Sequence, residues 1–209
     1  MIIDDIMARA PVIPVLVVEE DIDPVALAEA LVEGGLPVIE VTLRTPFALR
    51  AIHAMARVPG AVVGAGTVLD EAMLGIALDA GSRFIVSPGL TDPLARAAIA
   101  SGVPFLPGVA TAGDIMRGLD LGLSRFKFFP AEAAGGLAAL KALAAPFGQV
   151  EFCPTGGIRS DTAAAWLAHP AVRCVGGSWI LPPGERDMAA VTTRARAAAG
   201  LRNSRGPTG

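Results

Sequence analysis

Residues 37–66 read PVIEVTLRTPFALRAIHAMARVPGAVVGAG and contain the pattern that decides the fold. Pro37–Thr42 is short, apolar and rich in β-branched residues, which predicts a strand, and Ala61–Gly66 has the same character. Between them, Pro46–Arg57 has the length of a helix, and the pair Thr45-Pro46 is typical of a helix start. A strand, a helix and a second strand in close succession predict one parallel βαβ unit.

The same unit recurs along the chain at intervals of about twenty to thirty residues. Strands are predicted at Val12–Val18, Pro37–Thr42, Ala61–Gly66, Arg83–Ser87, Pro104–Pro107, Arg125–Phe129, Val150–Pro154 and Arg173–Gly177. Helices are predicted at Pro24–Glu33, Pro46–Arg57, Asp70–Ala80, Asp92–Ser101, Ala112–Leu121, Gly136–Ala145, Asp161–Ala168 and Glu185–Ala199.

This alternation places the chain in the α/β class and predicts a single (β/α)8 TIM barrel. Because no break in composition divides it, we expect one barrel domain over residues 1–202. Residues 203–209 (Asn-Ser-Arg-Gly-Pro-Thr-Gly) are predicted to form a disordered tail. The alternative is an open doubly wound sheet, but that fold usually has a GxGxxG turn after its first strand, where this chain has Val18-Glu19-Glu20.

Composition excludes several classes of function. A formal charge of −3 argues against non-specific binding of nucleic acid. The best apolar run, Val12–Val18, is far too short to span a membrane, and Met1–Met7 lacks the basic start of a secretory signal. Two cysteines and two histidines without metal-ligand spacing predict no metal site and no cofactor. The expectation is a cytoplasmic enzyme whose cysteines are buried thiols in neighbouring strands.

Two charged residues interrupt the predicted strands. Lys127 is one of two lysines in the chain and lies among phenylalanines, where burying an ammonium is costly and favours the neutral amine that attacks a ketone. Glu40 is a carboxylate in an apolar strand and is a candidate general acid/base. Taken singly, Lys127 is equally well explained as an ion-pair partner, and Glu40 as the partner of Lys127 or Arg44. Together they provide the nucleophile and the proton shuttle of a Schiff-base enzyme.

Further candidates follow the ends of strands, where the chemistry of a barrel lies. Arg44 follows the second strand and has a guanidinium suited to a carboxylate, although a surface role is as common. Glycine pairs follow the seventh and eighth strands at Gly156-Gly157 and Gly176-Gly177. Barrels often bind phosphate between these two loops through backbone N–H groups, so the two turns together indicate a phosphate site.

The ordered set of motifs resembles the bacterial 2-keto-3-deoxy-6-phosphogluconate (KDPG) aldolases and the related 4-hydroxy-2-oxoglutarate (KHG) aldolases. The matching stretches cover almost the whole chain and are Ile39–Thr45 (IEVTLRT), Gly64–Val68 (GAGTV), Ile85–Gly89 (IVSPG), Arg125–Glu132 (RFKFFPAE), Cys153–Ile158 (CPTGGI) and Val175–Ile180 (VGGSWI).

The resemblance implies roles for these positions. Lys127 would form the Schiff base, and Glu40 would act as general acid/base through a water molecule. The remaining residues would contact the substrate: Arg44 and Thr67 its carboxylate, Pro88 and Phe129 the pocket wall, Thr155 the bound substrate, and Gly156, Gly157, Gly176, Gly177 and Ser178 the phosphate. The family also implies a homotrimer, a metal-independent lyase, and cleavage of KDPG to pyruvate and glyceraldehyde 3-phosphate in sugar-acid catabolism.

Three alternatives remain at this point. The preferred substrate could be the galactonate epimer, 2-dehydro-3-deoxy-6-phosphogalactonate, or unphosphorylated KHG, which would give pyruvate and glyoxylate. A phosphate-binding isomerase or epimerase would need a second carboxylate or a metal set at the barrel mouth, and the sequence offers neither. A non-enzymatic oligomeric scaffold has no use for a buried amine beside a carboxylate.

Overall fold

The structure is a computed structural model, which describes residues 1–201 of the chain; the predicted tail at 203–209 lies outside the described residues. Within them the strands are β1 (Val12–Leu16), β2 (Val38–Thr42), β3 (Val62–Gly66), β4 (Ile85–Val86), β5 (Phe105–Leu106), β6 (Gly108–Val109), β7 (Arg125–Phe128), β8 (Glu151–Pro154) and β9 (Val175–Gly177). The helices are α1 (Ile3–Ala8), α2 (Pro24–Glu33), α3 (Ala48–Met55), α4 (Glu71–Asp79), α5 (Asp92–Ser101), α6 (Ala112–Asp120), α7 (Gly136–Ala144), α8 (Ala163–Leu167) and α9 (Met188–Ala199).

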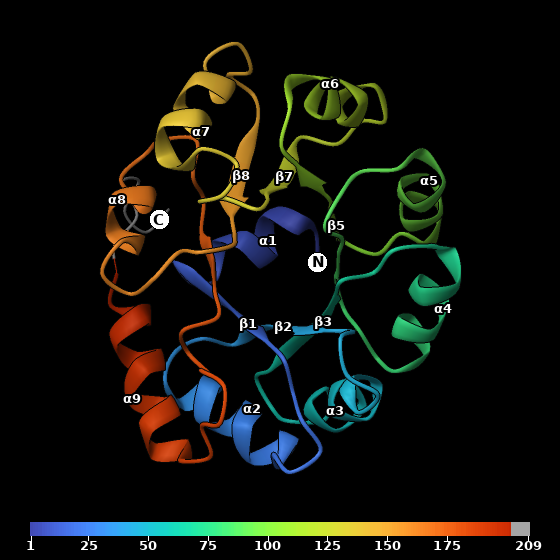
Figure 1. Ribbon diagram of the computed structural model, residues 1–209. Helices are drawn as coiled ribbons and strands as arrows, with labels where there is room; N and C mark the ends of the chain where they lie inside the picture. The colour runs from blue at the N-terminus through green and yellow to red at the C-terminus, as the bar shows by residue number, and fades with distance from the viewer. Residues whose placement is uncertain (202–209) are drawn as a thin grey trace.

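The strands form a curled parallel arrangement in two sheets. One sheet has the order β5-β4-β3-β2-β1-β9, and the other has the order β6-β7-β8. Isolated parallel bridges, Phe152 with Val172 and Thr155 with Gly176, link the end of β8 to the β9 segment. Figure 1 shows the strands around a common axis, with α2–α9 outside them.

Each predicted strand and helix contains an observed one, but two differences have clear physical causes. The predicted strand at Pro104–Pro107 contains β5, but the structure has a further short strand, β6, on the other side of Pro107. Proline has no N–H to donate to a ladder, so it interrupts the pairing. The predicted start of α3 at Pro46 is wrong, since the helix begins at Ala48. The Thr45 hydroxyl donates instead to Val18 O at 2.7 Å, which ties the loop after β2 to the loop after β1.

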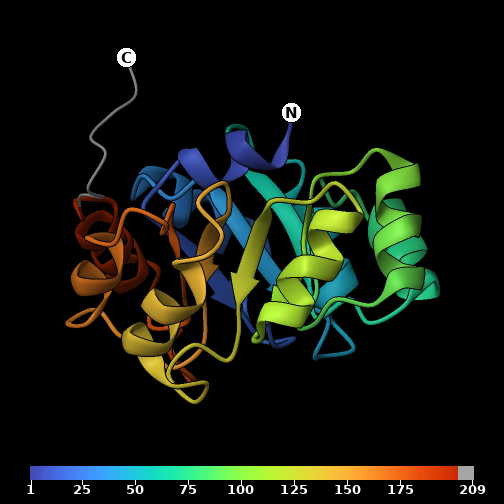
Figure 2. The same ribbon diagram turned by 90° about the horizontal axis from the view of Figure 1, so that it is seen from above.

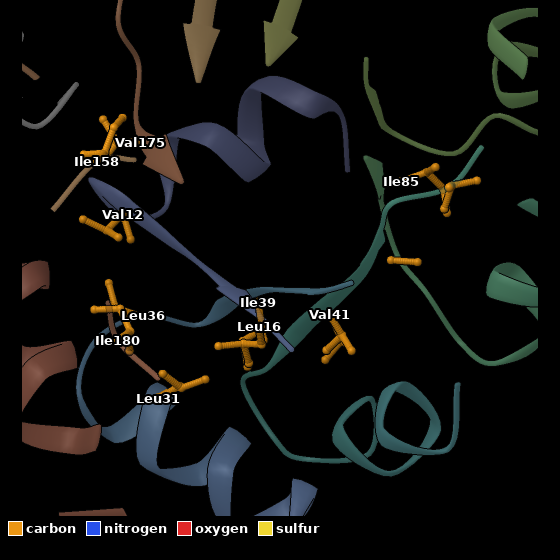
Figure 3. Close-up of a cluster of buried hydrophobic side chains, with 14 of the residues drawn as sticks. Val12, Leu16, Leu31, Leu36, Ile39, Val41, Ile85, Ile158, Val175 and Ile180 are labelled. Atoms are coloured by element: carbon orange, nitrogen blue, oxygen red, sulfur yellow. The ribbon is translucent and has the colours of Figure 1, made fainter. Parts of the chain in front are cut away.

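Alternation along each strand divides the buried residues into two cores. On β2, Ile39 and Val41 point outward into the core beneath the helices, as Figure 3 shows. Val38 belongs to a second core inside the curled sheet. Since side chains alternate between the two faces of a strand, Glu40 and Thr42 share the inward face with Val38.

Helix α1 closes one end of this inner core and was not predicted from the sequence. Its Ile6 and Met7 are fully buried against inward-facing strand residues. Its Asp4 accepts a hydrogen bond of 2.6 Å from Arg125 at the start of β7. Figure 2 shows α1 at the end of the sheet from which the strands start, so the opposite end carries the carboxyl ends of the strands.

The two cysteines are buried, as predicted, and the structure places them in this inner core. Cys153 on β8 and Cys174, one residue before β9, are both buried free thiols. A hydrogen bond with Cys153 and complete burial raise the pKa of the Cys174 thiol well above its ordinary value. Within residues 1–201, no helix is long and apolar enough to cross a membrane.

Candidate active site

Lys127 and Glu40 meet inside the curled sheet. Lys127 extends from β7 and Glu40 from β2, and their side chains are 7% and 4% exposed. The Lys127 Nζ donates to Glu40 Oε1 at 3.0 Å. The sequence left two explanations for these residues: an ion pair, or a nucleophile beside its proton acceptor. This contact is compatible with both. Among residues 1–201, Lys127 has the only buried side-chain amine. The geometry places a proton acceptor within hydrogen-bond reach of it, which is what a Schiff-base reaction requires.

The space for the Glu40 side chain comes from Gly66 at the end of β3. The register pairs Glu40 with Gly64 and Thr42 with Gly66 on the neighbouring strand. A Cβ on Gly66 would overlap Glu40 Oε1 and would lie 2.7 Å from Glu40 Cγ. Only glycine therefore leaves the carboxylate where it reaches Lys127. In the sequence, this Gly-Ala-Gly segment stands out only as part of the motif that contains Thr67, and nothing there indicates the space that its second glycine leaves.

An aromatic ring and a hydroxyl complete the immediate surroundings. The Phe129 ring centroid lies 5.3 Å from Lys127 Nζ, within the range of a cation–π contact. Lys127 on β7 pairs in register with Cys153 on β8. Thr155, two residues after Cys153, is the next residue of that segment on the inward face. Thr155 is buried, and its hydroxyl donates to Cys153 O at 3.4 Å. A Cβ on Gly176 would overlap Thr155 Oγ1, so a small residue there makes room for the threonine.

The two predicted phosphate turns differ in conformation. Gly156 and Gly157 have φ of 106° and 81°, a left-handed backbone that favours glycine. Gly176 and Gly177 instead belong to β9, and the Thr155–Gly176 bridge brings the two segments together. Ser178 follows β9 and is exposed.

Arg44 and Ser178 line one pocket of about 530 Å³ at the carboxyl ends of β1, β2 and β9. Apolar side chains from Val15, Val17 and Leu181 form much of its wall. Neither Lys127 nor Glu40 is part of this lining. The predicted residues therefore fall into an amine–carboxylate centre and a neighbouring pocket with a guanidinium and a hydroxyl.

Thr67 and Pro88 follow β3 and β4 at the same end of the sheet, and both are half-buried. Thr67 has φ of 61°, an unusual left-handed conformation for a residue with a branched Cβ. The Pro88 carbonyl lies against Gly108, where a Cβ would overlap it. Within residues 1–201, neither side chain forms a hydrogen bond or ion pair with Lys127 or Glu40, so their roles stay predictions. Among residues 1–201, no cluster of three or more histidine, cysteine, aspartate or glutamate side chains could hold a metal ion.

The chain matches known proteins over nearly its full length. A model of the KDPG and KHG aldolase family matches residues 3–194. A 2-dehydro-3-deoxy-phosphogluconate aldolase of Zymomonas mobilis is 57% identical over 202 residues, which cover 97% of each chain.

Two solved structures share the fold. The KDPG aldolase of Zymomonas mobilis ZM4 with 3-phosphoglycerate superimposes with a TM-score of 0.95 at 57% identity, covering 97% of each chain. The KDPG aldolase of Legionella pneumophila, with pyruvate captured as a covalent carbinolamine, gives a TM-score of 0.92 at 44% identity and covers 95% of this chain and 98% of that one.

Proposed function

This chain belongs to the KDPG and KHG aldolase family, and we propose that it is a class I aldolase, a lyase that cleaves KDPG to pyruvate and glyceraldehyde 3-phosphate. The observation that carries the proposal is the buried Lys127 amine with Glu40 Oε1 at 3.0 Å. The carbinolamine that pyruvate forms in the Legionella relative is the covalent chemistry such an amine performs.

In the first step, neutral Lys127 attacks the C2 carbonyl carbon of the substrate, and loss of water gives a protonated imine. Lys127 must give up a proton before it attacks; Glu40 is within reach to accept it, and returns it to the C2 oxygen as that oxygen leaves as water, so that Glu40 is ionised again. The imine then acts as an electron sink at C2. Because it does the work that a divalent metal does in other aldolases, the proposed reaction needs no metal and no cofactor.

In the second step, Glu40 removes the proton of the C4 hydroxyl, acting through a water molecule. The C3–C4 bond breaks, its electron pair passes into the imine to give an enamine, and glyceraldehyde 3-phosphate leaves with C4 as its aldehyde carbon. Glu40 then returns a proton to C3. Water hydrolyses the imine, which frees pyruvate and the Lys127 amine.

The other residues divide the substrate between them in this proposal. Arg44 and Thr67 hold the carboxylate, Pro88 and Phe129 form the wall, and Thr155 lies beside the reacting carbons. The phosphate binds to Gly156, Gly157, Gly176, Gly177 and Ser178. Support comes from the pocket that Arg44 and Ser178 share and from the phosphorylated acid bound to the Zymomonas relative.

We also propose that the two sheets are parts of a closed (β/α)8 barrel, within a domain of residues 1–202. If β5 and β6 are one strand interrupted at Pro107, the nine short strands become eight. The bridges at Thr155–Gly176 and Phe152–Val172 support closure between β8 and β9. A homotrimer and a cytoplasmic location remain predictions, which sedimentation analysis and cell fractionation would test.

The test is cleavage of KDPG, with pyruvate release measured for the native chain and for Lys127→Ala. Borohydride reduction in the presence of pyruvate should add a pyruvate-derived mass to the peptide that contains Lys127, and chelation with EDTA should leave the rate unchanged. No adduct, or an adduct elsewhere, would contradict the mechanism. Parallel rates with the galactonate epimer and with KHG identify the preferred substrate, and inactivity towards all three would revive the scaffold alternative.

A further inference from the structure

The Gly156–Gly157 turn presents two backbone donors whose direction is set by a neighbouring loop. Ala131 N donates to Thr155 O at 2.8 Å, and Glu132 N donates to Gly156 O at 3.0 Å. In a trans peptide the C=O and N–H bonds point in opposite directions. The N–H groups of Gly156 and Gly157 therefore both point away from the loop at 131–132, side by side.

The Gly156 N–H faces Gly176 across the parallel bridge between Thr155 and Gly176. Within residues 1–201, the Gly157 N–H donates no hydrogen bond to another protein atom. A free backbone N–H in a left-handed turn is a donor for an anion. The orientation of the turn should therefore control how tightly a phosphate is held.

The Glu132 side chain supports this turn from behind. A Cβ on Gly157 would lie 2.8 Å from both Cβ and Cγ of Glu132, so the glycine and the side-chain stem are in direct contact. The Trp166 indole N–H donates to Glu132 Oε1 at 3.2 Å. Trp166 is 2% exposed on α8, and it packs on Phe128, which neighbours Lys127 on β7.

The Glu132 carboxylate is exposed and lies near the Arg159 guanidinium, which offsets its negative charge beside the anion site. The buried indole N–H of Trp166 needs an acceptor, and the Glu132 oxygen supplies it while the stem of the same side chain braces Gly157. The contact thus links the rigid packing around Lys127 to the turn.

We propose that Glu132 and Trp166 form a positioning pair that fixes the Gly156–Gly157 turn and thereby sets the affinity for the substrate phosphate. The inference rests on the proposed function for the identity of the substrate, but the geometry of the pair is independent of it. Neither residue touches the reacting atoms. Their effect falls on binding of phosphorylated ligands and leaves the chemistry at Lys127 unchanged.

The test compares Glu132→Ala with Glu132→Gln. The glutamine keeps a side-chain oxygen for the Trp166 N–H and keeps the stem against Gly157, whereas alanine loses both. We expect Glu132→Ala to raise KM for KDPG about tenfold, the effect of losing one well-placed hydrogen bond. Its kcat, and its kcat/KM for unphosphorylated KHG, should stay within about twofold of the wild type. Glu132→Gln should have a KM for KDPG equal to or below that of the wild type.

Titration with inorganic phosphate separates this inference from the proposed function. The dissociation constant should rise about tenfold in Glu132→Ala and not in Glu132→Gln, whatever reaction the enzyme catalyses. If the wild type binds phosphate in this pattern but does not cleave KDPG, the proposed function fails and the positioning pair stands. Equal losses with KDPG and KHG, equal effects of both variants, tighter phosphate binding by Glu132→Ala, or no phosphate binding by the wild type would each overturn the inference.

Discussion

Replacing Gly66 with alanine tests whether the position of the Glu40 carboxylate controls the reaction. The backbone at Gly66 does not have positive φ, so alanine causes no conformational strain and acts only through its methyl group. That methyl would lie 2.7 Å from Glu40 Cγ and 2.8 Å from Cδ. Carbon atoms are in contact at about 3.5–4.0 Å, so the carboxyl group has to retreat by about 0.8 Å.

This retreat breaks the contact on which the proposed mechanism depends. If the carboxyl group moves away from Lys127, the Lys127–Glu40 distance of 3.0 Å lengthens to about 3.8 Å, beyond hydrogen-bond range. Misplacing a catalytic group by about 1 Å lowers rates by about 10²-fold, which corresponds to about 2.7 kcal/mol in the activation barrier. We therefore expect kcat/KM of Gly66→Ala, measured by pyruvate release from KDPG, to fall by about 10²-fold.

Gly75→Ala is the matched control. Gly75 lies on an exposed face of α4, and a Cβ there would meet nothing within 4 Å. The control should keep its activity and gain about 0.5–1 kcal/mol in free energy of unfolding, because alanine favours a helix. If folded Gly66→Ala, checked by circular dichroism, retains activity within about threefold of the wild type, the reasoning about Glu40 is refuted.

Three further predictions concern the core and its charges. Ile6→Ala on α1 should lower the free energy of unfolding by about 2–5 kcal/mol, because it leaves a cavity at a fully buried site. The control Ile2→Ala, at a position 62% exposed, should have little effect. Similar losses for both variants would contradict the role of α1. Cys153 and Cys174 should not react with Ellman's reagent at pH 8 until the chain is unfolded. Both thiols are buried, and the raised pKa of Cys174 also keeps its thiol protonated. Rapid reaction of the native protein would argue against this core. Partial burial acts to raise the pKa of Asp114, but hydrogen bonds from the start of α6 outweigh it and hold that pKa below its ordinary value. The stabilisation by Asp114 is thus present above about pH 4, the unfolded pKa, and is lost as pH falls through the folded pKa. Asp114→Ala should cost about 1 kcal/mol at pH 7 in denaturant unfolding and progressively less in acid, and a cost independent of pH would exclude the ionised carboxylate as its source.

The strand and helix pattern was predictable because it depends on local signals. Periods of 2 and 3.6, together with helix-start residues such as Asp23, whose side chain accepts from the N–H groups of Val25 and Ala26, are properties of short segments. Helix α1 was missed because six residues are too few to form a stable helix alone. It exists because Ile6 and Met7 are buried in the inner core.

The candidate site was predictable in part. Residues that break an apolar strand are visible in the sequence, and the ordered motifs gave Lys127 and Glu40 their expected roles. The bracing of Gly157 by Glu132 and the space at Gly66 were not visible. A glycine in a turn or at a strand end is common, and only the atoms opposite it show what it makes room for.

By itself, the sequence determined which residues of each strand share a face. Alternation along β2 placed Glu40 on the face opposite Ile39 and Val41 whatever the rest of the chain does. Only the tertiary structure decided that Glu40 meets Lys127, a residue 87 positions away on a strand of the other sheet. The physical reason is that side-chain direction follows from local backbone geometry, whereas a contact across the curled sheet requires the packing of all the strands between them.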